Sequence, residues 1–96
     1  MRRDAKVDRN QSEIVEALRK YGATVLITAQ LKNAFDILVG YKGNLHIMEI
    51  KDGLLVPSKK RLTEGELKCK ASFELVNVPY HKVESIEDAI NIIDPL

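Results

Sequence analysis

Two apolar runs separated by a short turn constrain this sequence most. The runs are FDILVG (35–40) and LHIMEIK (45–51), and β-branched and large apolar residues dominate both. Between them, YKGN supplies Gly43, whose backbone freedom suits the tight turn of a hairpin. The segment is therefore predicted to form two neighbouring antiparallel strands.

The predicted hairpin brings charged residues together. If Lys42 and Gly43 form a two-residue loop, counting outward places Asp36 opposite Glu49, although a bulge in the turn would shift this pairing by one residue. Directly opposed side chains have Cβ atoms about 4.5–5.5 Å apart, and opposed carboxylates repel each other. Lys51 follows Glu49 by two residues and points to the same face. A cation is therefore expected between the acids, either Lys51 or a divalent metal ion.

The rest of the chain carries the signals of three helices and two further strands. Asn10 with Glu13 and Thr63 with Glu66 match the capping-box pattern that begins helices. The helix, strand, strand, strand, helix, strand, helix order predicts an α/β domain in which helices cover a central sheet. The remaining predicted features are a helix end at Gly22, a strand at 24–28, a second helix from Thr63 to about residue 74, a strand late in 76–83 after Pro79, and a last helix that begins at Ser85.

The composition is that of one small folded domain spanning residues 1–96, with 1–9 as a loose arm. The chain is 45% hydrophobic and 30% charged, and its net charge of +1 gives no indication of a partner. Cys69 is the only cysteine, so no intrachain disulfide can form. No segment is long enough to span a bilayer and the N-terminus has no apolar signal region, so a cytoplasmic location is expected.

The acids and the lysine together predict phosphate chemistry. Mg²⁺ is typically held by one or two carboxylates together with water and phosphate oxygens. Asp36, Glu49 and the backbone carbonyl of Ile50 can supply such ligands. Lys51 can orient or deprotonate an attacking water or stabilise the charge that develops on a phosphate.

Asp36 followed by Glu49-Ile50-Lys51 resembles the signature of PD-(D/E)XK nucleases. The stretches NQSEIVEALRKYGATV, FDILVGYKGNLHIMEIKDG, LTEGE and VESIEDAI are similar to the small stand-alone VRR-NUC type found among phage proteins and related to Holliday-junction resolvases. The resemblance implies a restriction-endonuclease-like core with a mixed sheet of about four strands. It also implies a DNA endonuclease that depends on Mg²⁺ or Mn²⁺, without an organic cofactor.

Site roles follow from the same resemblance, residue by residue. Asp36 and Glu49 match the metal-binding acids, Lys51 the catalytic lysine, and Glu13 the acid on the first helix that approaches the metal. The chain departs from the family at Phe35, where proline is frequent. It departs again in the second helix, where the family often has Gln and the nearest residue is Glu66. The effect of this acid on metal or DNA contact stays open.

The resemblance also implies partners and a location. The partners are branched DNA, such as a four-way junction, and a second copy of the chain in a homodimer. The location is the cytoplasm of a host cell. The basic run Lys59, Lys60 and Arg61 would hold the DNA backbone without reading its sequence. Lys20, Lys32 and Arg2–Arg3 are weaker candidates for the same role.

Each assignment has an ordinary structural alternative. For Glu13 the alternative is a helix cap alone, for Asp36 a solvent-facing edge acid, and for Glu49 with Lys51 the solvated face of an amphipathic strand. For the basic run the alternative is a solvated loop. For the whole chain, the alternatives are a DNA-binding module that keeps the fold without cutting, and a nuclease that nicks linear duplex DNA. His46 alternates to the face opposite Glu49, and Cys69 is expected to pack within the second helix.

Overall fold

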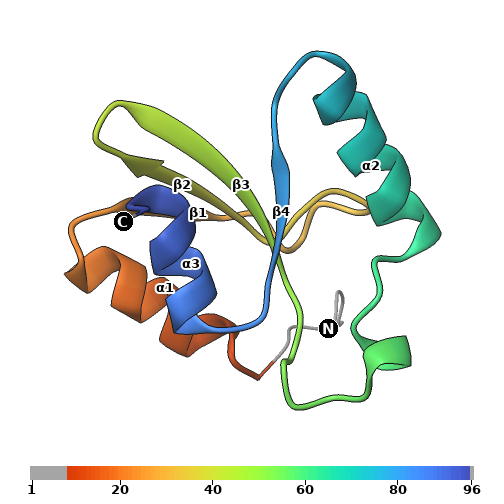
Figure 1. Cartoon of the computed structure of the whole chain (residues 1–96), viewed down its shortest axis with the longest axis horizontal. Helices are drawn as coiled ribbons and strands as arrows, with labels where there is room; N and C mark the ends of the chain where they lie inside the picture. Colours follow the sequence, from red (N-terminus) through yellow and green to blue (C-terminus); the bar gives the residue numbers. More distant parts are fainter. Residues whose placement is uncertain (1–8, 96) are drawn as a thin grey trace.

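The computed structural model describes residues 9–95, which form a four-stranded sheet with helices on both faces (Figure 1). The predicted α/β layout and its αβββαβα order, expected for a restriction-endonuclease-like core, are confirmed. The elements are α1 (Gln11–Lys20), β1 (Thr24–Ile27), β2 (Ile37–Tyr41), β3 (Asn44–Ile50), a 3₁₀ turn (Pro57–Lys59), α2 (Glu64–Leu75), β4 (Tyr80–Val83) and α3 (Ile86–Ile93).

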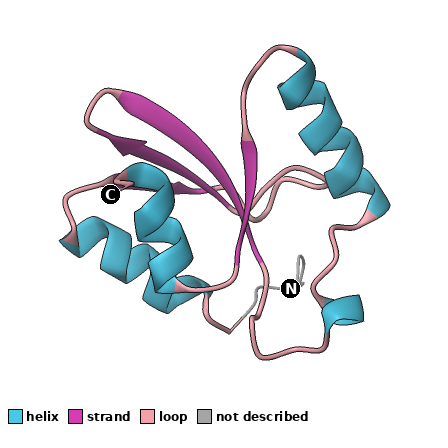
Figure 2. Ribbon diagram, viewed as in Figure 1, coloured by secondary structure: helices cyan, strands magenta, loops and turns pink. Residues whose placement is uncertain are grey.

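The sheet is mixed, with the strands in the order β1-β2-β3-β4 (Figure 2). The first three strands are antiparallel, and β4 lies parallel to β3 after the crossover through α2. The predicted hairpin register is confirmed from Tyr41 opposite Asn44 to Ile37 opposite Met48. Lys42 and Gly43 both have positive φ, as a type I′ turn requires, and this turn fixes the register.

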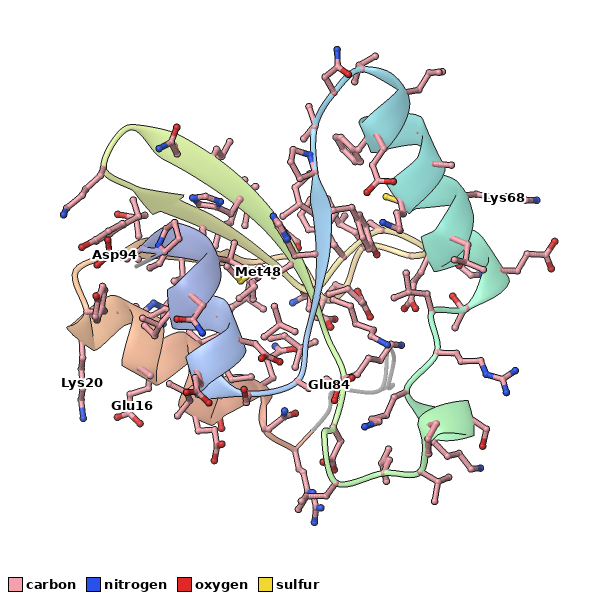
Figure 3. All side chains as sticks on the ribbon, in the orientation of Figure 1. Glu16, Lys20, Met48, Lys68, Glu84 and Asp94 are labelled. Atoms are coloured by element: carbon pink, nitrogen blue, oxygen red, sulfur yellow. The ribbon has the colours of Figure 1, made fainter. Side chains whose placement is uncertain are left out.

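The hydrophobic core lies between one face of the sheet and the helices α1 and α3. Ile14 and Leu18 of α1 are fully buried there, as are Met48 and Ile37 of the sheet. Figure 3 labels Met48 beside α3. Full burial of an apolar side chain of this size contributes about 1.5–3 kcal/mol, so these contacts hold the two helices on the sheet.

Among residues 9–95, the element that covers the opposite face of the sheet is α2, at one end. The Phe35 ring packs edge-on against Phe73 of α2 and Tyr80 of β4, with centroids 6.1 and 6.5 Å apart. None of the α2 residues is fully buried. Leu26 and Leu45, on the same face, are exposed. The aromatic contact therefore anchors α2 beside the end of β3 that carries Glu49.

Two of the three predicted helix caps are confirmed. Thr63 and Glu66 form the complete capping box of α2, and the Ser85 side chain caps α3. The predicted box of Asn10 and Glu13 is wrong, because the Asn10 side chain makes no cap bond. Its Nδ2 instead donates to the carbonyls of Lys51 and Glu84, at 3.1 and 3.2 Å. The Asn10 amide therefore ties the start of α1 to the ends of β3 and β4.

The predicted arm falls mostly outside the described residues, which begin at Arg9. Arg9 itself is paired, since its Nε donates to Oδ2 of Asp52 at 2.6 Å. Between residues 9 and 95, no helix has the length and apolar character needed to cross a membrane.

Candidate active site

Asp36 lies just before β2, where the hairpin ladder ends. Regular pairing stops at Ile37 opposite Met48, one residue short of the predicted Asp36–Glu49 pair. The Asp36 side chain takes the place of the next ladder bond, because its Oδ2 accepts a hydrogen bond from the Ile50 amide at 2.8 Å. This bond fixes the Asp36 carboxylate at the carboxyl end of β3.

Glu49 and Lys51 lie on the same face of the chain at that end, as predicted. Glu49 is only 5% exposed although it carries a carboxylate. The Lys51 Nζ lies 3.6 Å from Glu49 Oε2 and donates to Glu66 Oε1 at 3.0 Å. The ammonium group therefore joins an acid of β3 to an acid of α2.

The position of Glu66 is fixed by the way α2 begins. Its Oε1 also accepts from the Thr63 amide at 2.9 Å, as the N3 residue of the capping box. Beside it, Gly65 packs directly on the side chain of Asn33, and a Cβ at position 65 would overlap that side chain. Glu66 is therefore part of the site. Sequence analysis left its role open, although the capping box had marked the residue.

Acidic charge exceeds basic charge in this cluster, and the pKa values of its two glutamates move in opposite directions. Burial raises the pKa of Glu49 to about 9, with further contributions from a hydrogen bond to Glu66 and from the charge of Asp36. Burial also acts to raise the pKa of Glu66. Hydrogen bonds from Glu49, from the Thr63 amide and from Lys51 outweigh this effect, so the pKa of Glu66 is lowered. At neutral pH, a protonated Glu49 thus donates to an ionised Glu66.

The acids of this cluster also raise the pKa values of two neighbouring side chains, Cys69 and Tyr80. Burial raises the pKa of the Cys69 thiol, and the charges of Glu49 and Glu66 raise it further. The pKa of the Tyr80 hydroxyl is raised by burial and by the same two carboxyls, and its oxygen donates to the Ala34 carbonyl at 2.6 Å. The acids therefore lie against a poorly hydrated wall.

A pocket of about 340 Å³ opens onto these groups. Asp36, Glu49, Lys51 and Glu66 line it together with Ile50, Thr63 and the loop residues 29 and 31–35. The available donors are carboxylate oxygens and main-chain carbonyls, which suit Mg²⁺ or Mn²⁺ rather than a soft metal. In their chemistry, these donors therefore match the ligands that a hard divalent ion takes.

A divalent ion in this pocket would be held by two carboxylates and a main-chain carbonyl, with water molecules as its remaining ligands. Within the part of the chain that the structure describes, no group of three or more His, Cys, Asp or Glu side chains is arranged to hold a metal ion. Glu13, predicted as a further ligand, is exposed and lines a different pocket with Asp52 and Asp88. The structure thus brings together Asp36, Glu49 and Lys51, and leaves Glu13 apart from them.

The three residues of the predicted basic run do not all face solvent. Lys59 and Arg61 are exposed. Lys60 is held inside the fold, where its Nζ lies 3.1 Å from Glu84 Oε1 and 3.5 Å from the Gly53 carbonyl. Lys59 and Arg61 are therefore the cations of this run that face solvent, and Lys60 fixes the loop that carries them.

The other residues considered from sequence lie as follows. His46 is on the core face of β3, with its ring 6.5 Å from that of His81, and so points away from Glu49. Cys69 is a half-buried free thiol on α2. Lys32 lines the site pocket, and Lys20 is exposed at the end of α1 (Figure 3). Arg2 and Arg3 lie outside the described residues.

Comparisons with protein-family models, with curated proteins and with solved structures found no match to this chain.

Proposed function

We propose that this protein is a metal-dependent DNA endonuclease that hydrolyses phosphodiester bonds. The observation that carries the proposal is the placement of three acids, Asp36, Glu49 and Glu66, around one open pocket in which the ammonium group of Lys51 is paired with Glu49 and Glu66. Buried acids without sufficient positive charge are costly, so an ordinary structural role explains their placement poorly. A divalent ion and a phosphate are the pair of ligands that such a cluster best accommodates.

In this proposal, Asp36 and Glu49 hold the ion together with the Ile50 carbonyl. The ion would supply positive charge that offsets the negative charge developing on the phosphate. The Ile50 amide keeps the Asp36 carboxylate in place before the ion arrives. Glu49 must release its proton to bind the ion, so ion binding is coupled to deprotonation.

Lys51 would act on the attacking water. Its Nζ is already oriented by Glu49 and Glu66, which hold it at 3.6 and 3.0 Å. With Glu49 engaged as an ion ligand, the Lys51 ammonium group would be able to turn toward a water molecule or a phosphate oxygen. Glu66 keeps Lys51 at the pocket by the contact to α2.

The substrate is proposed to be branched DNA, bound by a homodimer in the cytoplasm. Lys59 and Arg61 follow the site strand by a few residues and offer exposed positive charge to the DNA backbone. A chain of 96 residues has a small surface for a duplex, and two copies related by a twofold axis would extend it and supply two sites.

Cleavage of a labelled four-way junction in Mg²⁺ or Mn²⁺ tests this function. Asp36→Asn and Lys51→Met should each reduce the cleavage rate by about 100-fold or more, because they remove an ion ligand and the group that acts on water. Both should keep junction binding in Ca²⁺. Glu16→Gln and Lys20→Met remove the same kinds of charge from the exposed face of α1 and should cleave like the wild type.

Titration with Mn²⁺ by calorimetry separates ion binding from catalysis. Asp36→Asn should bind Mn²⁺ more weakly than the wild type, and an equal affinity would rule out the proposed ligand set. A matched linear duplex tests the preference for branched DNA, since equal cleavage of both substrates indicates a nuclease for ordinary duplex.

A DNA-binding module without nuclease activity is the second candidate. It is favoured by the internal pairing of the site, in which Glu49, Lys51 and Glu66 already satisfy one another. Such a module would bind the junction without cutting it in any divalent metal. Its stability would also be unaffected by Mn²⁺, whereas the proposed nuclease should be stabilised.

A further inference from the structure

We propose that the loop after β3 carries an apolar wedge, Leu54–Val56, that contacts unstacked bases where DNA branches. This inference rests on the proposed function, because it assigns a DNA contact beside the same site. The loop begins after Ile50, the last residue of β3, with Lys51 as its first residue, and returns through Lys59 and Arg61. Leu54, Leu55 and Val56 are 83%, 41% and 60% exposed, so three consecutive apolar side chains face solvent.

The base of the loop is held by polar contacts. The Asp52 carboxylate accepts from the Leu54 amide at 3.0 Å and from Arg9 at 2.6 Å. Gly53 lies against Glu84, since a Cβ at position 53 would lie 3.0 Å from the Glu84 carbonyl oxygen. Lys60 joins Glu84 to the Gly53 carbonyl from the other side. Figure 3 labels Glu84 where the chain leaves β4, facing this loop.

This arrangement is unusual for a surface loop. The ion pairs and the hydrogen bond from the Leu54 amide to Asp52 fix the backbone of the loop. Pro57 restricts the backbone further where the 3₁₀ turn begins. The side chains of Leu54, Leu55 and Val56 nevertheless stay exposed, although the loop backbone is bonded from the Leu55 amide to the Asp52 carbonyl and from the Lys59 amide to the Val56 carbonyl. A rigid support under an exposed apolar tip is the arrangement expected for a contact surface.

The charges around the tip identify the partner as DNA and the contact as a base. Lys59 and Arg61 are exposed on the returning side and attract phosphates. On the other side, Leu54 lines a pocket with Arg9 and the acids Glu13, Asp52, Glu84 and Asp88, so the charge there is mainly negative and phosphates are favoured on the returning side. The faces of the bases are the apolar surface of DNA, and they are accessible where stacking is interrupted. A branch point next to the cutting site supplies such bases.

The test is fluorescence of 2-aminopurine placed at the branch of a four-way junction, in Ca²⁺ so that no cutting is needed. Wild-type protein should raise the fluorescence, because the wedge unstacks the probe. The triple variant Leu54→Ser, Leu55→Ser, Val56→Ser should lose this rise and bind the junction about tenfold more weakly, with duplex binding unchanged. The control Leu75→Ser, Val76→Ser removes exposed apolar residues at the end of α2 and should behave like the wild type.

Each other outcome has a definite reading. Junction binding by the wild type without a fluorescence rise, or an unchanged rise in the triple variant, overturns the wedge while the nuclease proposal stands. A wedge-dependent rise without cleavage in Mg²⁺ supports the wedge and removes the nuclease. A change in molecular mass of the triple variant by light scattering would make the tip a contact between protein chains and overturn the wedge. If the triple variant fails to fold, Leu54→Ser alone repeats the test.

Discussion

The buried proton of Glu49 predicts a pH-dependent stability that a single substitution should remove. The pKa of Glu49 is raised from 4.5 to about 9, chiefly by burial and then by the Glu66 hydrogen bond and the Asp36 charge. Between these two pH values the folded chain retains a proton that the unfolded chain has released. Stability therefore falls as pH rises through this window, and it is fully present only below the lower value. Glu49→Gln keeps a donor for Glu66 and removes the titration.

The size of the effect follows from one proton. In the window, the free energy of unfolding falls by about 1.4 kcal/mol per pH unit, so from pH 6 to pH 8 the wild type should lose about 3 kcal/mol relative to Glu49→Gln. Domains of this size have total stabilities of about 5–15 kcal/mol, so the difference is measurable. Urea denaturation of both proteins at the two pH values, in EDTA, gives it directly. Groups that titrate equally in both proteins cancel in the comparison.

The same experiment with Mn²⁺ connects this stability to ion binding. If Glu49 holds the ion as proposed, the ion would take the place of the proton, so Mn²⁺ should stabilise the wild type more at pH 8 than at pH 6, and Glu49→Gln less at either pH. Glu16→Gln, on the exposed face of α1, is the control for loss of an acid. If the difference between the wild type and Glu49→Gln in EDTA is the same at pH 6 and pH 8, Glu49 is ionised in the folded protein and the account of the site fails.

Three further substitutions test how α2 is held. Tyr80→Phe removes the hydrogen bond to the Ala34 carbonyl and should cost about 1–2 kcal/mol of unfolding free energy in urea, and an unchanged value refutes the bond. Thr63→Ala removes the capping box and should cost about 1 kcal/mol in the same assay, and an unchanged value would show that the cap bond adds no stability. Gly65→Ala should weaken Mn²⁺ binding, and Asn33→Gly added to it should restore binding; no rescue would show that this contact does not position α2.

Sequence reasoning succeeded where the determinants are local. The hairpin register followed from a two-residue turn, because Lys42 and Gly43 adopt the positive φ values that such a turn needs. The caps of α2 and α3 followed from short patterns within one turn of helix. Asn10 failed the same test, because carbonyls at the ends of β3 and β4, far away in sequence, compete for its side chain.

The site was predicted only in part for a similar reason. Asp36, Glu49 and Lys51 belong to one hairpin, so their meeting could be counted from the turn. The contribution of Glu66 depends on how α2 lies over the sheet, and α2 carries no amphipathic pattern that would have indicated it. The separation of Glu13 from the other acids depends on where α1 begins, which the Asn10 contacts decide.

Phe35 and Glu66, where the sequence departs from the nuclease pattern that it resembles, make separate contacts that both involve α2. The Phe35 ring packs against Phe73 of α2. The same helix presents Glu66 to Lys51. An acid at this position adds negative charge to a site that already has two carboxylates, and the proton on Glu49 compensates for it. Any divalent ion must therefore displace a proton as well as bind. Phe35 holds α2 on the sheet, and α2 places Glu66 beside Glu49. This contact is therefore expected to make ion binding by the protein depend on pH.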